Sequence, residues 1–199
     1  PRWRRAPALP LRAPSWLGQP WNVKIFNQLV YARHGARQRR TIVHPETYFY
    51  PLDILRNWNW LYGKRGFTQY QAVLPGPSNH ARHRRFVEAL RARGGQVFLC
   101  VIKDCGAEGR GMLSFPKPGV SYALDLPVDA RTQALVDGLN EIVIAEGGRI
   151  YLAKDAFTRA EHFRAMEPRL DAFNAVRRRW DPEGRLKSAQ SIRVLGDRP

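Results

Sequence analysis

Residues at every second position along three predicted strands would share one face of a sheet. This mixed face collects amides, a lysine, a hydroxyl and small apolar groups: Gln69, Gln71, Leu99, Val101, Lys103, Ser121 and Ala123. A sheet face open to water usually carries more charge and fewer Leu and Val residues. Apolar walls with a few placed polar groups are typical of a ligand site. The other interpretation is a face packed on another domain, and both hold if the site lies between domains.

Six segments with the hydrophobic periods of strands and helices place this mixed face in a sheet. Apolar runs and alternation predict strands at 67–74, 96–103, 120–126 and 149–152, and helical spacing predicts helices at 79–93 and 130–146. This order is that of the ferredoxin-like split β-α-β fold. The sequence therefore predicts an α+β domain in which two helices cover one face of an antiparallel sheet.

The face under the helices is expected to be apolar. Its residues would be Tyr70, Ala72, Leu74, Phe98, Cys100, Ile102, Tyr122, Leu124 and Leu126. Cys100 is therefore expected to be a small core residue, and Cys105 follows the same strand. No cluster of Cys and His has the spacing of a metal site, so none is expected. His80 and His83 are expected on a basic, solvated helix face.

The flanking segments predict three parts: a linker and helix over 1–40, an α+β domain with the mixed face over 41–158, and C-terminal helices with a tail over 159–199. Further helices are expected at 21–31, 51–63, 159–166 and 169–180. Thr158 and Glu161 have the spacing of a capping box. The tail from Asp181 is polar and lacks an apolar face. We therefore expect it to be mobile until it docks on a partner.

The charge balance indicates an acidic partner. The 199 residues carry a formal net charge of +16, which suits nucleic acid, a phosphate-bearing substrate, an acidic protein or an anionic membrane surface. A GC-rich genome explains an arginine-rich composition equally well. The basic run 33–40 is a solvated loop or a contact with phosphate or lipid headgroups. No apolar run is long enough to span a bilayer and no signal peptide is visible, which predicts a cytoplasmic protein or one peripheral at the inner membrane.

Several short motifs carry a resemblance to a known family. They are Gln69-Tyr-Gln71, Val101-Ile-Lys103, Leu113-Ser-Phe-Pro116, the run from Gly147 to Asp155, and Asp181-Pro182, with Phe26-Asn-Gln-Leu29, Tyr50-Pro-Leu-Asp53, Trp58-Asn59 and Leu61-Tyr-Gly63 as further agreement. The sequence resembles the C-terminal half of FAD-linked oxidases of the vanillyl-alcohol-oxidase type. Within them it is most similar to bacterial enzymes that oxidise a polyprenyl-phosphate sugar for cell-wall polysaccharides. The match covers nearly the whole chain in order.

The resemblance implies a reaction and a set of site residues. In such oxidases a secondary alcohol of a sugar becomes a ketone by hydride transfer to the flavin, which needs a hydrogen-bond partner for the hydroxyl and exclusion of water. Lys154 is the first choice for contact with that hydroxyl and Lys103 the second, because a buried lysine of depressed pKa can serve as such a partner. The implied substrate-binding residues are Gln69, Gln71, Val101, Cys105, Ser121, Ala123 and Tyr151. Ser121, Ala123 and Cys105 depart from the family pattern, where an Asn, a Cys and an aromatic residue stand.

The resemblance also implies a cofactor and partners. FAD would be held mostly by a half that these residues do not contain. Residues 41–158 would then be the substrate-binding domain, and 159–199 would dock on that half. The expected partners are an FAD-binding domain or subunit and a sugar or phospho-sugar substrate. The start at Pro1 indicates a fragment or a trimmed product. A non-catalytic interaction subunit with the oxidase fold is the alternative. An RNA-binding module of ferredoxin-like fold is disfavoured, because it needs aromatic residues on the open face, whereas Tyr70, Phe98 and Tyr122 are assigned to the helix side.

Overall fold

The structure is a computed structural model that describes residues 7–12, 14, 20–34, 40, 42–50, 55–78, 80–95, 97 and 99–198. The chain divides into two compact units, residues 1–67 and 68–199. The first unit contains the helices α1 (Pro20–His34) and α2 (Pro45–Phe49) and the 3₁₀ helix η2 (Trp58–Tyr62). The rings of Tyr62 and Phe67 stack with their centroids 4.4 Å apart. The helix predicted over 51–63 is thus limited to η2 among the described residues, and 51–54 lie outside them.

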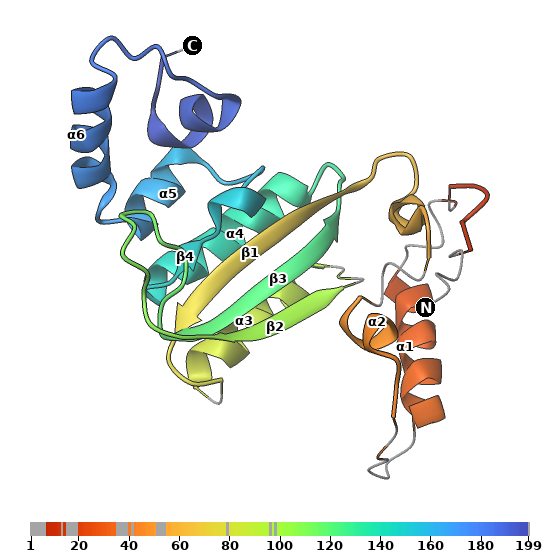
Figure 1. Cartoon of the computed structure of the whole chain (residues 1–199). Coiled ribbons are helices and arrows are strands. Elements are labelled where there is room, and N and C mark those ends of the chain that lie inside the picture. Colours follow the sequence, from red (N-terminus) through yellow and green to blue (C-terminus); the bar gives the residue numbers. More distant parts are fainter. Residues whose placement is uncertain are drawn as a thin grey trace. The chain divides into compact units, whose positions relative to one another are not determined.

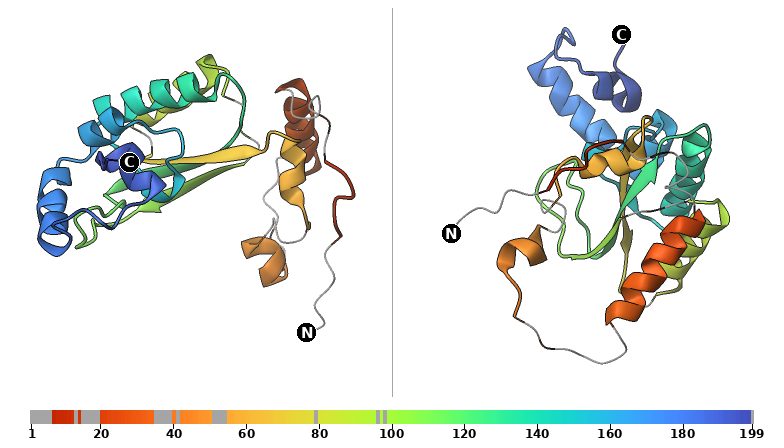
Figure 2. Two further views of the ribbon diagram at one scale, coloured as in Figure 1. Left: turned by 90° about the horizontal axis from the view of Figure 1, so that it is seen from above. Right: turned by 90° about the vertical axis from the view of Figure 1, so that its right-hand side faces the viewer.

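The second unit contains the predicted antiparallel sheet, in the order β2-β3-β1-β4. Its strands are β1 (Phe67–Pro75), which begins at the last residue of the first unit, β2 (Cys100–Cys105), β3 (Gly119–Pro127) and β4 (Arg149–Ile150). The helices α3 (Ala81–Ala92) and α4 (Thr132–Ala145) lie on the same face of the sheet (Figures 1 and 2). This arrangement confirms the α+β fold class with helices on one face.

The core lies between this face and the two helices, as the alternation predicts. Alternate residues of β1 and β3 are buried there against Phe86 and Leu90 of α3 and Val136, Leu139 and Val143 of α4; those strand residues are Tyr70, Ala72, Leu74, Tyr122, Leu124 and Leu126. Gly119 approaches β1 so closely that a Cβ there would meet the Leu74 carbonyl oxygen at 2.0 Å. The long apolar strands β1 and β3 therefore form the centre of the sheet.

The edge strands differ from the prediction. Strand β2 begins at Cys100 rather than residue 96, and of the four residues before it the structure describes Val97 and Leu99 only. Cys100 is exposed and Ile102 is 60 % exposed, so the expected core role of Cys100 is wrong. Both occupy the helix-side positions of an edge strand, whereas the buried core draws on the inner strands β1 and β3. On the other edge, β4 ends at Ile150 and the chain turns into the 3₁₀ helix η3 (Leu152–Lys154).

Two polar residues also differ from the prediction. His83 is buried, with Nε2 3.3 Å from the Gly76 carbonyl oxygen and its ring against Tyr122, so the expected solvated position is wrong. The predicted capping box is absent from α5 (Ala160–Met166), where the N-cap residue is Arg159 and its side chain makes no capping hydrogen bond. The Thr158 hydroxyl is instead buried and lies 3.5 Å from Nδ2 of Asn140.

The C-terminal segment packs within the second unit. The helix α6 (Leu170–Trp180) is followed by the π-helical turn η4 (Ser191–Leu195), which lies against α5. Val194 is 1 % exposed and belongs to the core cluster. Arg193 donates to the carbonyl oxygens of Asp155 and Thr158 at 2.7 and 2.9 Å. The expectation that the tail from Asp181 lacks an apolar face is therefore wrong, while its mobility and the docking of 159–199 on a partner stay predictions.

Candidate functional site

One cleft of about 570 Å³ opens on the second unit beside the mixed face. It is lined by residues of the three longest strands, of the loop between β2 and β3, and of the segment after β4: Gln71, Lys103, Cys105, Leu113, Ser114, Phe115, Pro116, Ser121, Tyr151, Leu152 and Lys154. Lys103 and Ser121 are cross-strand partners in the β2–β3 pair. The period of two along the strands therefore brings side chains distant in sequence to one side of the sheet.

The floor of the cleft is polar and ordered. Gln71 Nε2 donates a hydrogen bond of 2.8 Å to Ser121 Oγ, and both side chains are buried. This bond joins the central strands β1 and β3 through their side chains. Because a buried amide and hydroxyl cost free energy unless they are paired, the bond fixes the orientation of both groups toward the cleft.

Two lysines also line the cleft. Lys103 is exposed at the edge strand β2, and Lys154 is half-buried at the end of η3, where its backbone N–H donates to the Tyr151 carbonyl oxygen at 2.8 Å. Burial lowers the pKa of Lys154, the Lys103 ammonium lowers it further, and Asp125 offsets part of the shift. Lys154 is therefore easier to deprotonate than a solvated lysine, as a group that exchanges a proton with an alcohol requires.

The side walls are apolar and aromatic. The rings of Phe115 and Tyr151 lie 4.8 Å apart at an interplanar angle of 39°. Leu113 and Leu152 pack against the core of the unit. Tyr151 is held close to β1, because its backbone N–H donates to the Gln71 carbonyl oxygen at 2.8 Å. Flat apolar walls around a few polar groups match the general form of a small-molecule site.

The structure brings six of the nine predicted site residues to this cleft: Gln71, Lys103, Cys105, Ser121, Tyr151 and Lys154. The other three lie on the same sheet but do not line the cleft. Gln69 donates to Asp125 Oδ1 at 2.8 Å, and Val101 and Ala123 are cross-strand partners. The functional roles assigned to all nine remain predictions.

Sequence reasoning did not place the wall residues Leu113–Pro116 and Leu152 in the site. Residues 113–116 lie in an irregular loop, where neither the strand nor the helix period applies. Their one signal was the Leu-Ser-Phe-Pro run that formed part of the family resemblance.

In the part of the chain that the structure describes, His, Cys, Asp and Glu nowhere gather in a group of three or more that could hold a metal ion. Among the same residues, every helix is too short or too polar to cross a membrane.

The donor set of the cleft fits contact with one edge of a flavin ring or with a sugar. Two ammonium groups and an amide suit carbonyl oxygens and anionic groups, and the Phe115 and Tyr151 rings suit a flat ring system.

Comparison with known proteins finds several relatives, two of which are described here. The chain is 35 % identical over 186 residues, 94 % of its length, to the protein named decaprenylphosphoryl-beta-D-ribose oxidase of Mycolicibacterium smegmatis. It is 34 % identical over 164 residues, 81 % of its length, to an uncharacterized protein in the mprA 5′ region of Streptomyces coelicolor. No family model matches the chain.

The chain spans 40 % and 44 % of the lengths of these relatives. The first match runs through almost all of the chain, including both compact units. The resemblance found in the short motifs is thereby confirmed: this chain is related in sequence, along almost its whole length, to a part of decaprenylphosphoryl-beta-D-ribose oxidase.

Proposed function

We propose that this chain supplies the substrate-binding part of an FAD-dependent oxidoreductase that oxidises a secondary alcohol of a sugar or of a polyprenyl-phosphate sugar. The observation that carries the proposal is the cleft, in which a lysine of lowered pKa stands over a polar floor in a chain related to an oxidase. A bound FAD would supply the hydride acceptor, and we propose that residues outside this chain hold most of it.

Lys154 is proposed to handle the proton of the substrate hydroxyl. Removal of a hydride from a carbinol carbon leaves a hydroxyl whose proton must be lost or shared. The Nζ atom of Lys154 suits this role, since its pKa is lowered by burial and by the Lys103 ammonium. A neutral amine accepts a hydrogen bond from the alcohol, and the ammonium that forms is then stabilised in part by Asp125.

Lys103 is proposed to bind the substrate rather than to exchange a proton with it. It is exposed on the edge strand and lies across the pair from Ser121. An exposed ammonium group suits a phosphate or another anionic group of the substrate. Gln71 would orient a sugar hydroxyl, because its amide is already fixed by the bond to Ser121.

Cys105 gives a direct test of where the substrate binds. Cys105 lines the cleft, whereas Cys100 lies on the opposite face of the same strand, and both are free thiols. The chain is combined with an FAD-binding part and alkylated with iodoacetamide in the presence of polyprenylphosphoryl ribose. At a ligand concentration about ten times Kd, alkylation of Cys105 should slow about tenfold, because only the free protein reacts.

Cys100 is the internal control and should react at an unchanged rate. Polyprenyl phosphate without the sugar should protect less, since the polar floor would then lack its partner. Equal alkylation rates of Cys105 with and without the phospho-sugar would contradict the assignment of the cleft to this substrate class.

A further inference from the structure

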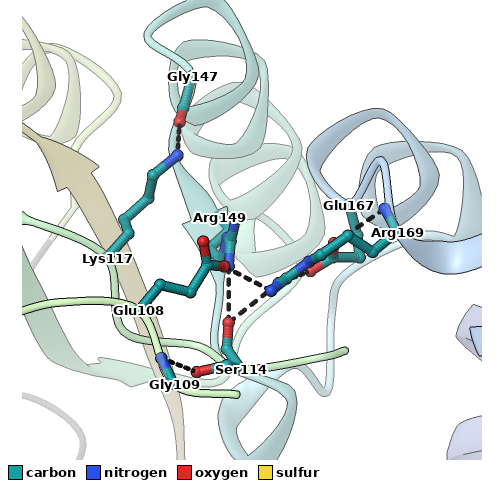
Figure 3. A network of polar contacts seen from close by, with 8 residues as sticks. All are labelled: Glu108, Gly109, Ser114, Lys117, Gly147, Arg149, Glu167 and Arg169. Atoms are coloured by element: carbon teal, nitrogen blue, oxygen red, sulfur yellow. Dashed lines mark hydrogen bonds and ion pairs between the residues drawn. The ribbon is translucent and has the colours of Figure 1, made fainter. Parts of the chain in front are cut away.

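The wall Leu113–Pro116 lies in a loop without helix or strand, yet it is held firmly by charged groups. Arg149 Nη1 donates to the Ser114 carbonyl oxygen at 2.6 Å, and Arg169 Nη2 donates to the same oxygen at 3.1 Å. Figure 3 shows both guanidinium groups directed at this loop from the side of β4 and α6. The backbone of the wall is thus anchored between two arginines.

The same arginines also hold the opposite end of the loop. Arg149 Nη1 and Arg169 Nη1 both bond to Glu108 Oε1. Inside the loop, the Gly109 N–H donates to Ser114 Oγ at 3.0 Å. A Cβ at Gly109 would approach that oxygen to 2.7 Å, so the loop closes tightly there. Glu108, Ser114 and the two guanidinium groups therefore form one closed set of contacts.

Both arginines are fixed by the fold behind them. Arg149 belongs to β4, where it is the cross-strand partner of Val73, and its side chain is only 9 % exposed. Arg169 is gripped by the buried carboxylate of Glu167 through two contacts of 2.6 Å. Nε of Arg149 has no partner among the described residues. The bonds of Arg149 Nη1 to Glu108 and Ser114 therefore satisfy only part of a guanidinium that the fold has taken out of water.

We propose that Glu108, Arg149 and Arg169 are positioning residues that set the place of the cleft wall through Ser114. Leu113 and Phe115 flank Ser114 and line the cleft, so an anchor on the Ser114 carbonyl group fixes the apolar side against which the substrate would lie. A wall built on a loop would otherwise move on its own, because loops open more readily than strands. The proposal rests on the proposed function only in taking the cleft as the substrate site.

Amide exchange tests the proposal without substrate or FAD, so its failure is separate from failure of the proposed function. Glu108→Gln removes the charge and keeps the shape. The Gly109 and Ser114 amides should then exchange about 10- to 100-fold faster, the effect of losing a charge-assisted contact. Cys105, which lies beside this wall, should be alkylated several-fold faster in the same variant, with the Cys100 rate unchanged.

Arg169→Lys is the second variant, since it keeps a positive charge while losing the paired contacts to Glu108 and Ser114. Glu183→Gln is the matched control, because Glu183 forms an exposed ion pair with Arg185 away from the cleft. Unchanged exchange at Gly109 and Ser114 in both loop variants would overturn the proposal. Faster exchange spread equally over β1 and β3 would also overturn it, because the network would then stabilise the whole unit rather than position the wall.

Discussion

Two lysines share the cleft, and their surroundings differ. Burial and the neighbouring charge lower the pKa of Lys154, while Lys103 is exposed on the edge strand. The difference follows from position: Lys154 ends a short 3₁₀ helix beside the wall residues, and Lys103 projects from the outermost strand. The lysine that we propose for proton exchange and the lysine that we propose for charge recognition therefore come from two separate elements.

His83 is expected to make the free energy of unfolding of the second unit depend on pH. Burial lowers the pKa of His83, and the Gly76 carbonyl oxygen offsets part of the shift. The unfolded chain, with an ordinary histidine pKa of about 6.5, binds a proton first as the pH falls, so the free energy of unfolding should decrease below about pH 6.5. Urea unfolding of the wild-type chain between pH 8 and pH 5 measures this decrease.

The control for this prediction is His83→Gln, which removes the titrating ring but keeps a polar side chain. Its free energy of unfolding is expected to vary less with pH over the same range than that of the wild type. If the two pH profiles are parallel, the loss of stability comes from other groups.

At the scale of elements, sequence reasoning succeeded where burial follows a period. The strands β1 and β3 and the helix α4 lie in the centre of the unit, and their apolar positions recur at two and at 3.6 residues. The same period placed Gln71, Lys103 and Ser121 on the side of the sheet where the cleft lies. A central element packs against several neighbours, so the period of its apolar residues indicates which of its faces is buried.

Prediction from the sequence failed where contacts between segments distant in the chain determine the position of a residue. Cys100 reads as a core residue from alternation alone, yet its strand lies at the edge. Thr158 has the spacing of a helix cap, yet its hydroxyl meets Asn140 from another helix. The wall Leu113–Pro116 depends on arginines 35 and 55 positions after Ser114 in sequence. No local pattern encodes such contacts.

The C-terminal turn η4 provides a test at this scale. Val194 is 1 % exposed in the core cluster, so Val194→Ala should lower the free energy of unfolding by about 1–3 kcal/mol through lost apolar burial. Val176→Ala on α6 is the matched control, because Val176 is 41 % exposed. Urea unfolding of both variants measures the difference. Equal, small losses would mean that η4 does not pack on α5 in solution.

The whole chain carries a net charge of +16 and spans less than half of each relative. A net charge of this size attracts anionic ligands and anionic surfaces over about a Debye length. This charge suits a phosphate-bearing substrate, and the cleft offers Lys103 for the local contact. The proposed function therefore joins a global electrostatic preference with a local site, and it requires the FAD-binding part for chemistry.

The most direct test of this account combines the chain with an FAD-binding part and measures anaerobic single-turnover oxidation of polyprenylphosphoryl ribose. Bleaching of the visible flavin absorbance is followed for the wild type, Lys154→Met and Lys103→Met, with the exposed Lys187→Met as control. The wild type and the control should bleach at the same rate. Lys154→Met should lower the bleaching rate by about 10²–10⁴-fold, the usual contribution of a proton-transfer group. Lys103→Met should mainly raise the substrate concentration needed for the half-maximal rate. Unchanged bleaching in both cleft variants, or none in the wild type, would contradict the account.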